Sequence, residues 1–244
     1  MERALLEAHD RLEATHWWFE GRRRVIAAVL RRWLAPVPSR TVLDVGCGTG
    51  GMFPLLQRFG RVEGAEVSAE ARARASAKFP GVRVSPCALP GLLPPGPFDV
   101  VTAFDVVEHV AEAVESLEAM RARLRPGGQL VLTVPAFQFL WSRHDELNHH
   151  QRRYTRGLLR AQLTAAGLDL QYASYFNTVL FPAVAAVRAV HRLFPALEGE
   201  ASDLAPAPPP LNWMLTRLFG AEARLVGRVP VPYGVSLIAV ARAP

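Results

Sequence analysis

The chain has 244 residues, of which 50% are hydrophobic and 20% charged, a composition typical of a folded globular protein with one elaborated domain or two small ones. Its formal net charge is +6, and arginine supplies almost all of the positive charge because Lys78 is the only lysine. The arginine bias, with abundant Ala, Leu, Pro and Gly, indicates a GC-rich coding background, so we expect no nucleic-acid partner. A basic surface can still favour an acidic substrate or an anionic membrane face.

The cysteine pattern and the apolar runs narrow the class of protein further. Cys47 and Cys87 are the only cysteines and form no Cys-x-x-Cys pair, which argues against a structural zinc site and a disulfide framework. Residues 1–10 lack the long apolar core of a signal peptide. The apolar stretch 178–197 is interrupted by Pro182 and several basic residues, so it is too broken to span a membrane. We expect a cytoplasmic monomer or homodimer, with peripheral membrane contact as an alternative.

Strand and helix patterns alternate along most of the chain. In chain order they predict helix 1–34, strand 42–45, helix 51–59, strand 62–67, helix 69–79 after the N-cap Ser68, strand 82–85, strand 98–104, helix 106–124, a turn at 126–128, strand 129–134, helix 155–166, strand 168–175, helices 177–197 and 211–220, and strand 235–241. This alternation predicts an α/β fold with an open, doubly wound parallel sheet. We divide the chain into an N-terminal helical cap (1–38), a core (39–175), an apolar helical insertion (176–233) and a final strand (234–244).

Residues 42–50, Val-Leu-Asp-Val-Gly-Cys-Gly-Thr-Gly, carry the most information. An apolar strand runs into a loop with glycines at 46, 48 and 50, where the backbone can turn sharply and approach a ligand closely. Asp44 is unsuited to holding a pyrophosphate, but it can accept hydrogen bonds from an ammonium group, directly or through water. A nucleoside with a cationic amino-acid tail fits this loop, and S-adenosylmethionine (SAM) is the obvious one.

A second carboxylate supports this assignment. Glu66 follows Gly46 by twenty residues, at the end of the second strand, where an acid can accept hydrogen bonds from both ribose hydroxyls. The carboxyl ends of parallel strands meet at one edge of a sheet. We therefore expect a common edge for the residues at or just past these ends, namely Asp44, Glu66, Cys87, Asp105 and Pro135.

The chain resembles the class I SAM-dependent methyltransferases, including the small-molecule methyltransferases of quinone biosynthesis. The resemblance is carried by residues 42–50, Glu66, the region 98–110 and Leu124-Arg125-Pro126-Gly127-Gly128. It implies a Rossmann-like sheet of seven strands with the last strand antiparallel. It also implies that SAM is bound by Asp44, Gly46, Cys47, Gly48, Gly50, Glu66, Val67, Cys87, Ala88, Leu89, Phe104, Asp105 and Val106.

One segment departs from the family pattern. After the third strand the family often has an acid that accepts a hydrogen bond from the adenine amino group, but here the run is Ser85-Pro86-Cys87-Ala88-Leu89. We expect adenine to be recognised by the backbone around Cys87–Leu89 and by apolar contact. In this interpretation Cys87 is a small apolar filler and not a nucleophile.

Asp105, Glu108 and His109 share one face of the helix predicted over 106–124. The simpler interpretation is a capping box, in which Asp105 caps the helix and Glu108 reaches back to its amide, while His109 lines the pocket near the methyl group. The alternative is a divalent-metal site that lowers the pKa of a bound hydroxyl. The same Asp/Glu-x-x-Glu-His pattern resembles the quinone-biosynthesis O-methyltransferases, where these positions hold magnesium. We favour the cap.

Residues 141–154 predict a polar loop on the rim where an acceptor would enter. His144, Asp145, His150, Arg153 and Tyr154 are candidates for acceptor binding. Either His144 or His150 is a candidate general base, and with His109 they make up the predicted catalytic histidines. A surface loop whose polar side chains cap neighbouring elements is an equally good interpretation.

Two further regions bear on the acceptor. Trp17, Trp18 and Arg23 could close over the cofactor, with the arginine meeting its carboxylate, or could simply pack on the sheet. The insertion could cover a lipid-like or aromatic acceptor, rest on a membrane, or form core or a dimer contact.

We predict methyl transfer from SAM to a small molecule, by O- or C-methylation of a lipid, quinone or glycosyl-lipid. The alternatives are a SAM-binding protein without catalysis, an NAD-dependent oxidoreductase on a related fold, and an RNA methyltransferase. The chain lacks the Asn-Pro-Pro-Tyr-type motif of amino-methylating enzymes, which argues against RNA methylation.

Overall fold

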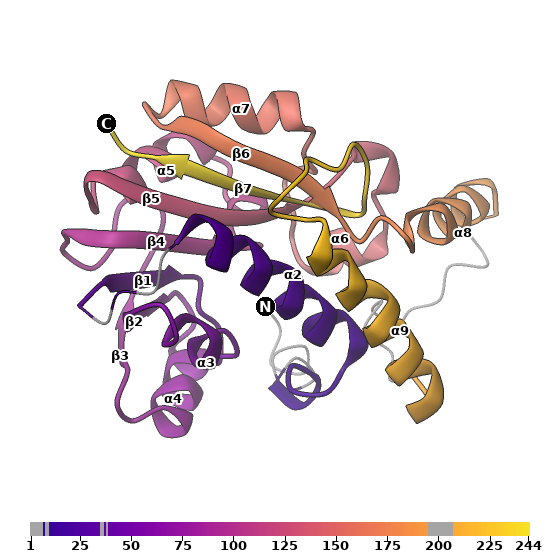
Figure 1. Ribbon diagram of the computed structural model, residues 1–244, viewed down its shortest axis with the longest axis horizontal. Coiled ribbons are helices and arrows are strands. Elements are labelled where there is room, and N and C mark those ends of the chain that lie inside the picture. The colour runs from indigo at the N-terminus through magenta and orange to yellow at the C-terminus, as the bar shows by residue number, and fades with distance from the viewer. Residues whose placement is uncertain (1–6, 8–9, 35–36, 38, 195–206) are drawn as a thin grey trace.

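The structure is a computed structural model that describes residues 7, 10–34, 37, 39–194 and 207–244 (Figure 1). The strands are β1 (Thr41–Val45), β2 (Arg61–Glu66), β3 (Arg83–Pro86), β4 (Phe98–Phe104), β5 (Leu124–Pro135), β6 (Asp169–Phe176) and β7 (Ser236–Arg242). The helices are α2 (Trp17–Trp33), α3 (Phe53–Leu56), α4 (Ala69–Lys78), α5 (Ala113–Arg121), α6 (Arg143–Leu147), α7 (Arg156–Ala165), α8 (Phe181–Leu193) and α9 (Pro209–Ala221), with 3₁₀ turns η1 (Val107–His109), η2 (Gln138–Leu140) and η4 (Glu222–Arg224). The parts of the expected elements at 1–6, 8–9 and 195–206 lie outside the described residues.

The seven strands form one sheet in the order β3-β2-β1-β4-β5-β7-β6. β1 to β5 pair in parallel, whereas β7 is antiparallel to both β5 and β6. The predicted Rossmann-like sheet with an antiparallel last strand is confirmed. Because β7 inserts between β5 and β6, the last residues of the chain complete the middle of one half of the sheet.

Neighbouring residues of each strand point to opposite faces of the sheet, and in the central strands both sets are apolar. Helices therefore cover both faces. Leu43 and Val101 pack with Leu117 of α5 and Leu159 of α7 in one hydrophobic cluster. On the other face, Val42 and Val100 pack with residues of α2, α3 and α9. α2 and α9 lie side by side although they are far apart in sequence (Figure 1).

The helix predicted over 106–124 is wrong in its first turns. Asp105 has a φ of +57°, which redirects the chain as it leaves β4. Val107–His109 form only a 3₁₀ turn, and Val110 is extended, with φ −102° and ψ 130°. α5 therefore begins at Ala113. The β-branched residues at 106, 107 and 110 have low helix propensity, which is consistent with this break.

Two more elements differ in extent from their predictions. The helix expected over 51–59 is reduced to α3, and the chain continues to Phe59 through i→i+3 hydrogen bonds such as Phe59 N–H to the Leu56 carbonyl at 2.8 Å. β5 starts at Leu124 and includes the expected turn at 126–128. Its pairing with β4 is irregular between Phe98 and Val100, where Gly127 adopts a φ of +75°.

In its described residues, the insertion between β6 and β7 contains two α-helices of different character. α9 packs on α2 through Phe219, which is fully buried and stacks on Phe176 of β6. α8 buries none of its residues. None of the helices in the described part of the chain is long and apolar enough to cross a membrane.

Candidate active site

Five parallel strands end at one edge of the sheet, at Val45, Glu66, Pro86, Phe104 and Pro135. The strand order reverses between β1 and β4, and open α/β sheets bind ligands outside such a switch point. The residues predicted to gather there do so: Asp44, Glu66, Cys87, Asp105 and Pro135.

The glycine-rich loop after β1 has a left-handed backbone at three positions. Gly46, Gly48 and Gly50 have φ of +67°, +55° and +89°. A Cβ on Gly46 would lie 2.5 Å from Cγ2 of Val106, and one on Gly50 would lie 2.8 Å from Cδ2 of Phe79. A Cβ on Gly48 would meet no protein atom within 4 Å. The outer glycines are thus required by packing, while Gly48 borders open space.

Asp44 lies on β1 beneath this loop and is only 2% exposed. Its Oδ1 accepts a 2.6 Å hydrogen bond from the hydroxyl of Thr102 on β4. Burial raises the pKa of Asp44 to about 7, and the neighbouring carboxylate of Glu66 adds to this effect, whereas Thr102 and the guanidinium of Arg22 oppose it. Asp44 is therefore a buried carboxyl group that a cationic ligand would help to ionise.

Glu66 connects the glycine-rich loop to the start of α4. Its Oε2 accepts a hydrogen bond from the N–H of Gly48, and its Oε1 accepts one from the N–H of Ser68, both at 2.9 Å. A carboxylate has about four lone-pair sites, so Glu66 keeps acceptor capacity for the hydroxyl groups of a ligand. Ser68 caps α4 as predicted, with its Oγ accepting from Ala71 N–H at 3.2 Å.

The segment after β3 is held by its own backbone. Cys87 N–H donates to the Glu66 carbonyl at 3.2 Å, and Ala88 pairs with Leu92 through two backbone hydrogen bonds. Burial raises the pKa of Cys87 to about 11, and it raises that of Cys47 above the usual range as well. Both thiols are therefore protonated near neutral pH, which agrees with Cys87 as a small filler. Leu89 is partly buried, and Val67 is exposed.

Arg22, and not Arg23, reaches the edge of the sheet from α2. Its Nη2 lies 2.6 Å from Oδ2 of Asp105 and donates to the Thr133 hydroxyl at 3.2 Å. Its guanidinium also lies over the rings of Trp18 and Phe104. Arg23 instead donates to the carbonyls of Glu13 and Ala14, just before α2.

Arg22 lies on the buried face of α2. Phe19, Arg22, Ile26, Val29 and Leu30 recur at i, i+3 and i+4 spacing and form a buried stripe. Arg23 is i+4 from Phe19 and i−3 from Ile26, so helical spacing alone does not separate it from Arg22. Arg22 is buried whereas Arg23 is only partly buried, and the packing of α2 on the sheet decides this difference. Trp17 packs on Phe219, so it belongs to the contact between α2 and α9.

The capping box predicted at Asp105 and Glu108 is wrong. The carboxylate of Asp105 pairs with Arg22 and accepts a 2.9 Å hydrogen bond from Thr133, and no α-helix starts there. Glu108 is fully buried, and neither of its carboxylate oxygens has a hydrogen-bond partner. Burial, together with Asp105 nearby, raises the pKa of Glu108 well above its usual range.

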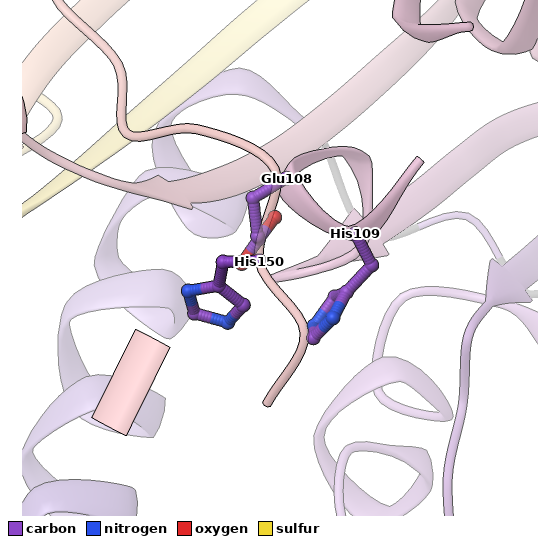
Figure 2. A group of neighbouring side chains, drawn as sticks. All are labelled: Glu108, His109 and His150. Atoms are coloured by element: carbon purple, nitrogen blue, oxygen red, sulfur yellow. The ribbon is translucent and has the colours of Figure 1, made fainter. Parts of the chain in front are cut away.

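Two histidines lie beside this carboxyl group. Figure 2 shows Glu108 and His109 on the turn after β4 and His150 on the segment that follows α6. One ligand atom from each of the three lies within 4.8 Å of the other two. Desolvation by surrounding atoms and the proximity of His150 lower the pKa of His109 to about 4, although the residue as a whole remains exposed. Asp105 is not part of this group.

The segment 141–154 is ordered around a buried charge, and it includes α6 where a loop was predicted. Asp145 is fully buried, and its Oδ1 accepts 2.8 Å hydrogen bonds from His150 Nδ1 and from Arg153 Nε. Although burial favours the neutral acid, these donors hold the pKa of Asp145 below its usual range. Tyr154 is buried and pairs with Ala136. The side chains of Asp145, Arg153 and Tyr154 are therefore buried inside the segment 141–154 and stabilise its conformation.

His144 and His150 lie closer to the surface of the same segment, with ring centroids 6.2 Å apart. The N–H of Gln151 donates to the Glu108 carbonyl at 2.7 Å, which fixes this segment against the turn after β4. The three predicted catalytic histidines are thus neighbours at one end of the sheet edge. Sequence spacing placed Glu108 beside His109 but did not indicate that His150 would join them.

Curated relatives share only part of their length with this chain. A trans-aconitate 2-methyltransferase of Azoarcus sp. (strain BH72) is 32% identical over 62% of this chain and 61% of its own length. A ubiquinone biosynthesis O-methyltransferase of Albidiferax ferrireducens is 33% identical over 47% of this chain and 52% of its own. A tRNA U34 carboxymethyltransferase of Shewanella denitrificans is 35% identical over 42% and 34%.

Solved structures agree in fold. A putative methyltransferase in complex with the Haloferax volcanii Trm112 activator has a TM-score of 0.64 at 20% identity, covering 99% of this chain and 95% of that one. The geranyl diphosphate C-methyltransferase of Streptomyces coelicolor has a TM-score of 0.60 at 17% identity, covering 90% and 75%. The methyltransferase domain family matches residues 17–173, which is most of the chain. The chain belongs to this family, the class I SAM-dependent methyltransferases, with SAM as the cofactor.

Proposed function

We propose that the protein transfers a methyl group from SAM to a small, lipid-like acceptor, at an oxygen or carbon atom of a lipid, quinone or glycosyl-lipid. The arrangement of Asp44, Gly48 and Glu66 carries the proposal: two carboxyl groups flank an open glycine at the switch point of the sheet. Asp44 would meet the ammonium group of SAM, and Glu66 the two ribose hydroxyls. The methyl donor is already activated by its sulfonium charge, so the protein has mainly to align donor and acceptor and exclude water.

The other predicted cofactor residues surround these three. In this proposal Gly46, Cys47 and Gly50 shape the loop, Val67, Cys87, Ala88 and Leu89 border the adenine, and Phe104, Asp105 and Val106 border the methionine part. Arg22 takes the role predicted for Arg23, because its guanidinium stands at the sheet edge and is close enough to influence the ionisation of Asp44. A guanidinium there would bind the SAM carboxylate while it remains paired with Asp105.

The proposed acceptor class is supported by the histidines at the edge of the sheet and by the insertion. His109, His144 and His150 stand where an acceptor would enter, and we propose that they contact it. The insertion, residues 176–233, exposes apolar side chains on both of its helices: Val187, Val190 and Leu193 on α8, and Leu211, Trp213, Met214 and Leu218 on α9. The α8 residues recur every third position, and Leu211, Met214 and Leu218 of α9 are spaced i, i+3 and i+7. Such exposed apolar helix faces are typical of contact with lipid. The insertion would therefore cover a lipid-like acceptor, with 1–38 as the cap over SAM.

Transfer of a labelled methyl group tests the proposal. The protein is incubated with methyl-labelled SAM and a bacterial extract, which is then separated into lipid, RNA and water-soluble fractions. We expect label in the lipid fraction with the natural protein and none with Gly48→Ala. Label in RNA alone would contradict the small-molecule acceptor, and SAM binding without label in any fraction would favour a non-catalytic protein. Binding of NAD in place of SAM would contradict the donor assignment.

Vesicle binding tests the role of the insertion separately. We expect the protein to sediment with vesicles of phosphatidylcholine and phosphatidylglycerol, and Leu193→Glu on α8 to reduce this fraction several-fold. Leu158→Glu is the matched control, because Leu158 is an exposed leucine on α7. Equal loss with both variants, or no binding by the natural protein, would contradict lipid contact through α8.

A further inference from the structure

Glu108 is in a state that an isolated carboxyl group rarely adopts in a folded protein. Its side chain is fully buried, and neither oxygen is hydrogen-bonded. Burying a polar group without a partner costs about 1–3 kcal/mol, and more if the group is charged. Such groups in native proteins usually face an ion, a water molecule or a ligand. The carboxyl group of Glu108 therefore has unused capacity as a ligand.

The two imidazoles beside it are held in a way that leaves one nitrogen of each available. His109 Nδ1 lies 2.8 Å from the carbonyl oxygen of Asn148, and His150 Nδ1 lies 2.8 Å from Oδ1 of Asp145. Both oxygens can only accept, so Nδ1 carries the hydrogen in each ring. Nε2 of a neutral ring then carries a lone pair. Metal-binding histidines commonly donate their other N–H to a carbonyl or carboxylate in this manner.

Asp105 cannot easily serve as a further ligand, although the sequence pattern placed it beside Glu108 and His109. Its carboxylate already accepts from Thr133 and pairs with Arg22 at 2.6 Å. A metal ion at Asp105 would also have to lie close to the guanidinium of Arg22, and two positive charges at that distance repel. The magnesium-type set of Asp105, Glu108 and His109 therefore does not fit this structure.

We propose that Glu108, His109 and His150 bind a divalent transition-metal ion such as Zn²⁺, Mn²⁺ or Fe²⁺. Their ligand atoms lie within 4.8 Å of one another, and the 2.7 Å hydrogen bond from Gln151 to Glu108 holds the two contributing segments together. Ligands at about 2.1 Å from one ion stand about 3–3.5 Å apart, so the side chains have to close by at most about 1.5 Å. Two imidazoles and one carboxylate favour these ions over Mg²⁺, which prefers oxygen ligands.

An ion bound by Glu108, His109 and His150 would also limit which acceptors the protein can methylate, and this part of the inference rests on the proposed function. Three protein ligands leave at least one position open, and an ion there would favour an acceptor that presents a hydroxyl or another oxygen donor. The three side chains follow β4 and α6, at the rim where the acceptor is expected to enter. Ion binding itself needs neither SAM nor the acceptor, so it can be tested alone.

The test measures metal binding by the untagged chain of 244 residues after removal of metals by dialysis against a chelator. Calorimetric titration is expected to show one Zn²⁺ bound, and Co²⁺ to give a visible spectrum of a nitrogen- and oxygen-ligated ion. Mg²⁺ should bind at least about tenfold more weakly. Glu108→Gln and His150→Gln should each weaken Zn²⁺ binding by at least about tenfold, and the stabilisation of the fold by Zn²⁺ should fall accordingly.

His144→Gln is the matched control, because His144 lies on the same segment with its ring 6.2 Å from that of His150 but outside the three-residue group. It should bind Zn²⁺ as the natural chain does. Absence of Zn²⁺ binding, unchanged binding in Glu108→Gln, equal loss in His144→Gln, or preference for Mg²⁺ would each overturn the proposal. Thermal melting without metal and titration with SAM show whether each variant is folded. They also separate a failed metal site from a failed methyl-donor site.

Discussion

Asp44 makes SAM binding sensitive to pH in a direction that the structure determines. Without ligand, burial raises the pKa of this carboxyl group to about 7, so half of the molecules carry it protonated at neutral pH. In the proposed complex the ammonium group of SAM lies beside it and favours the ionised form. SAM then binds the ionised form preferentially, and binding releases a proton from the molecules that hold one. The affinity should therefore rise with pH.

The size of the effect follows from the ionised fraction of Asp44. With a pKa of about 7, roughly 3% of the groups are ionised at pH 5.5 and roughly half at pH 7, so the affinity for SAM should rise about 15-fold over this interval. The interval lies below the pKa of about 7.8 of a free α-amino group, so SAM keeps its ammonium charge. Asp44→Asn should bind SAM weakly and with little pH dependence, because asparagine does not titrate.

Calorimetry with SAM at pH 5.5, 6.0, 6.5 and 7.0 measures this effect. Asp99→Asn is the control, since Asp99 lies at the other end of β4, where it accepts hydrogen bonds from Thr41 at 2.7 and 2.9 Å and pairs with Arg125. It should keep the pH dependence of the natural chain. A flat profile in the natural chain, or the same slope in Asp44→Asn, would refute the placement of the ammonium group beside a buried, partly protonated Asp44.

The same group affects stability without ligand. A carboxyl group whose folded-state pKa is raised favours folding while it is protonated, so this contribution is lost as the pH rises from about 4 to about 7. The pKa change from 3.8 to about 7 corresponds to roughly 4 kcal/mol. Asp44→Asn should therefore unfold at a higher urea concentration than the natural chain at pH 7, while the two should differ little near pH 4.

Five further substitutions test packing and the binding site for the cofactor. Gly48→Ala should lower SAM affinity strongly, because its Cβ enters space that is free of protein atoms. It should also lower the free energy of unfolding by about 1–2 kcal/mol, because the φ of +55° disfavours a side chain. Gly50→Ala should mainly destabilise the fold, since its Cβ meets Phe79 at 2.8 Å. Phe219→Ala should cost about 3–5 kcal/mol in urea unfolding because the ring is fully buried, whereas Trp213→Ala, 62% exposed on the same helix, should change stability little. Arg22→Gln should lower the free energy of unfolding by about 3 kcal/mol, because it leaves Asp105 without its ion pair. It should also weaken SAM binding. Unchanged SAM affinity would contradict the role of Arg22 at the cofactor carboxylate.

The local patterns of the core predicted its fold well. Strands such as Val42–Val45 are short apolar runs, and Ser68 is a helix cap that acts within four residues. Such signals depend on neighbours in the chain, so periodicity and turn residues are sufficient to find them. The antiparallel last strand came from the family resemblance and is confirmed by the pairing of β7 with β5 and β6.

The least predictable part of the site follows β4. The spacing of Asp105 and Glu108 is that of a capping box, but the carboxylate of Asp105 takes Arg22 from α2 as its partner. That contact joins residues 83 positions apart, and with Asp105 at a φ of +57° no helix begins at this point. A spacing rule cannot weigh a local cap against a charge that arrives from a distant helix.

The sequence by itself determined the sheet, the glycine-rich loop and the carboxyl groups at its edge, because these features arise from short-range patterns that parallel α/β folds repeat. Only the tertiary structure decided that Arg22 reaches the edge instead of Arg23, that Asp145 is buried under the rim, and that His150 joins Glu108 and His109. These outcomes depend on which side chain of a helix faces the sheet, and on which distant group satisfies a buried charge. Both are decided by packing and desolvation over the whole molecule.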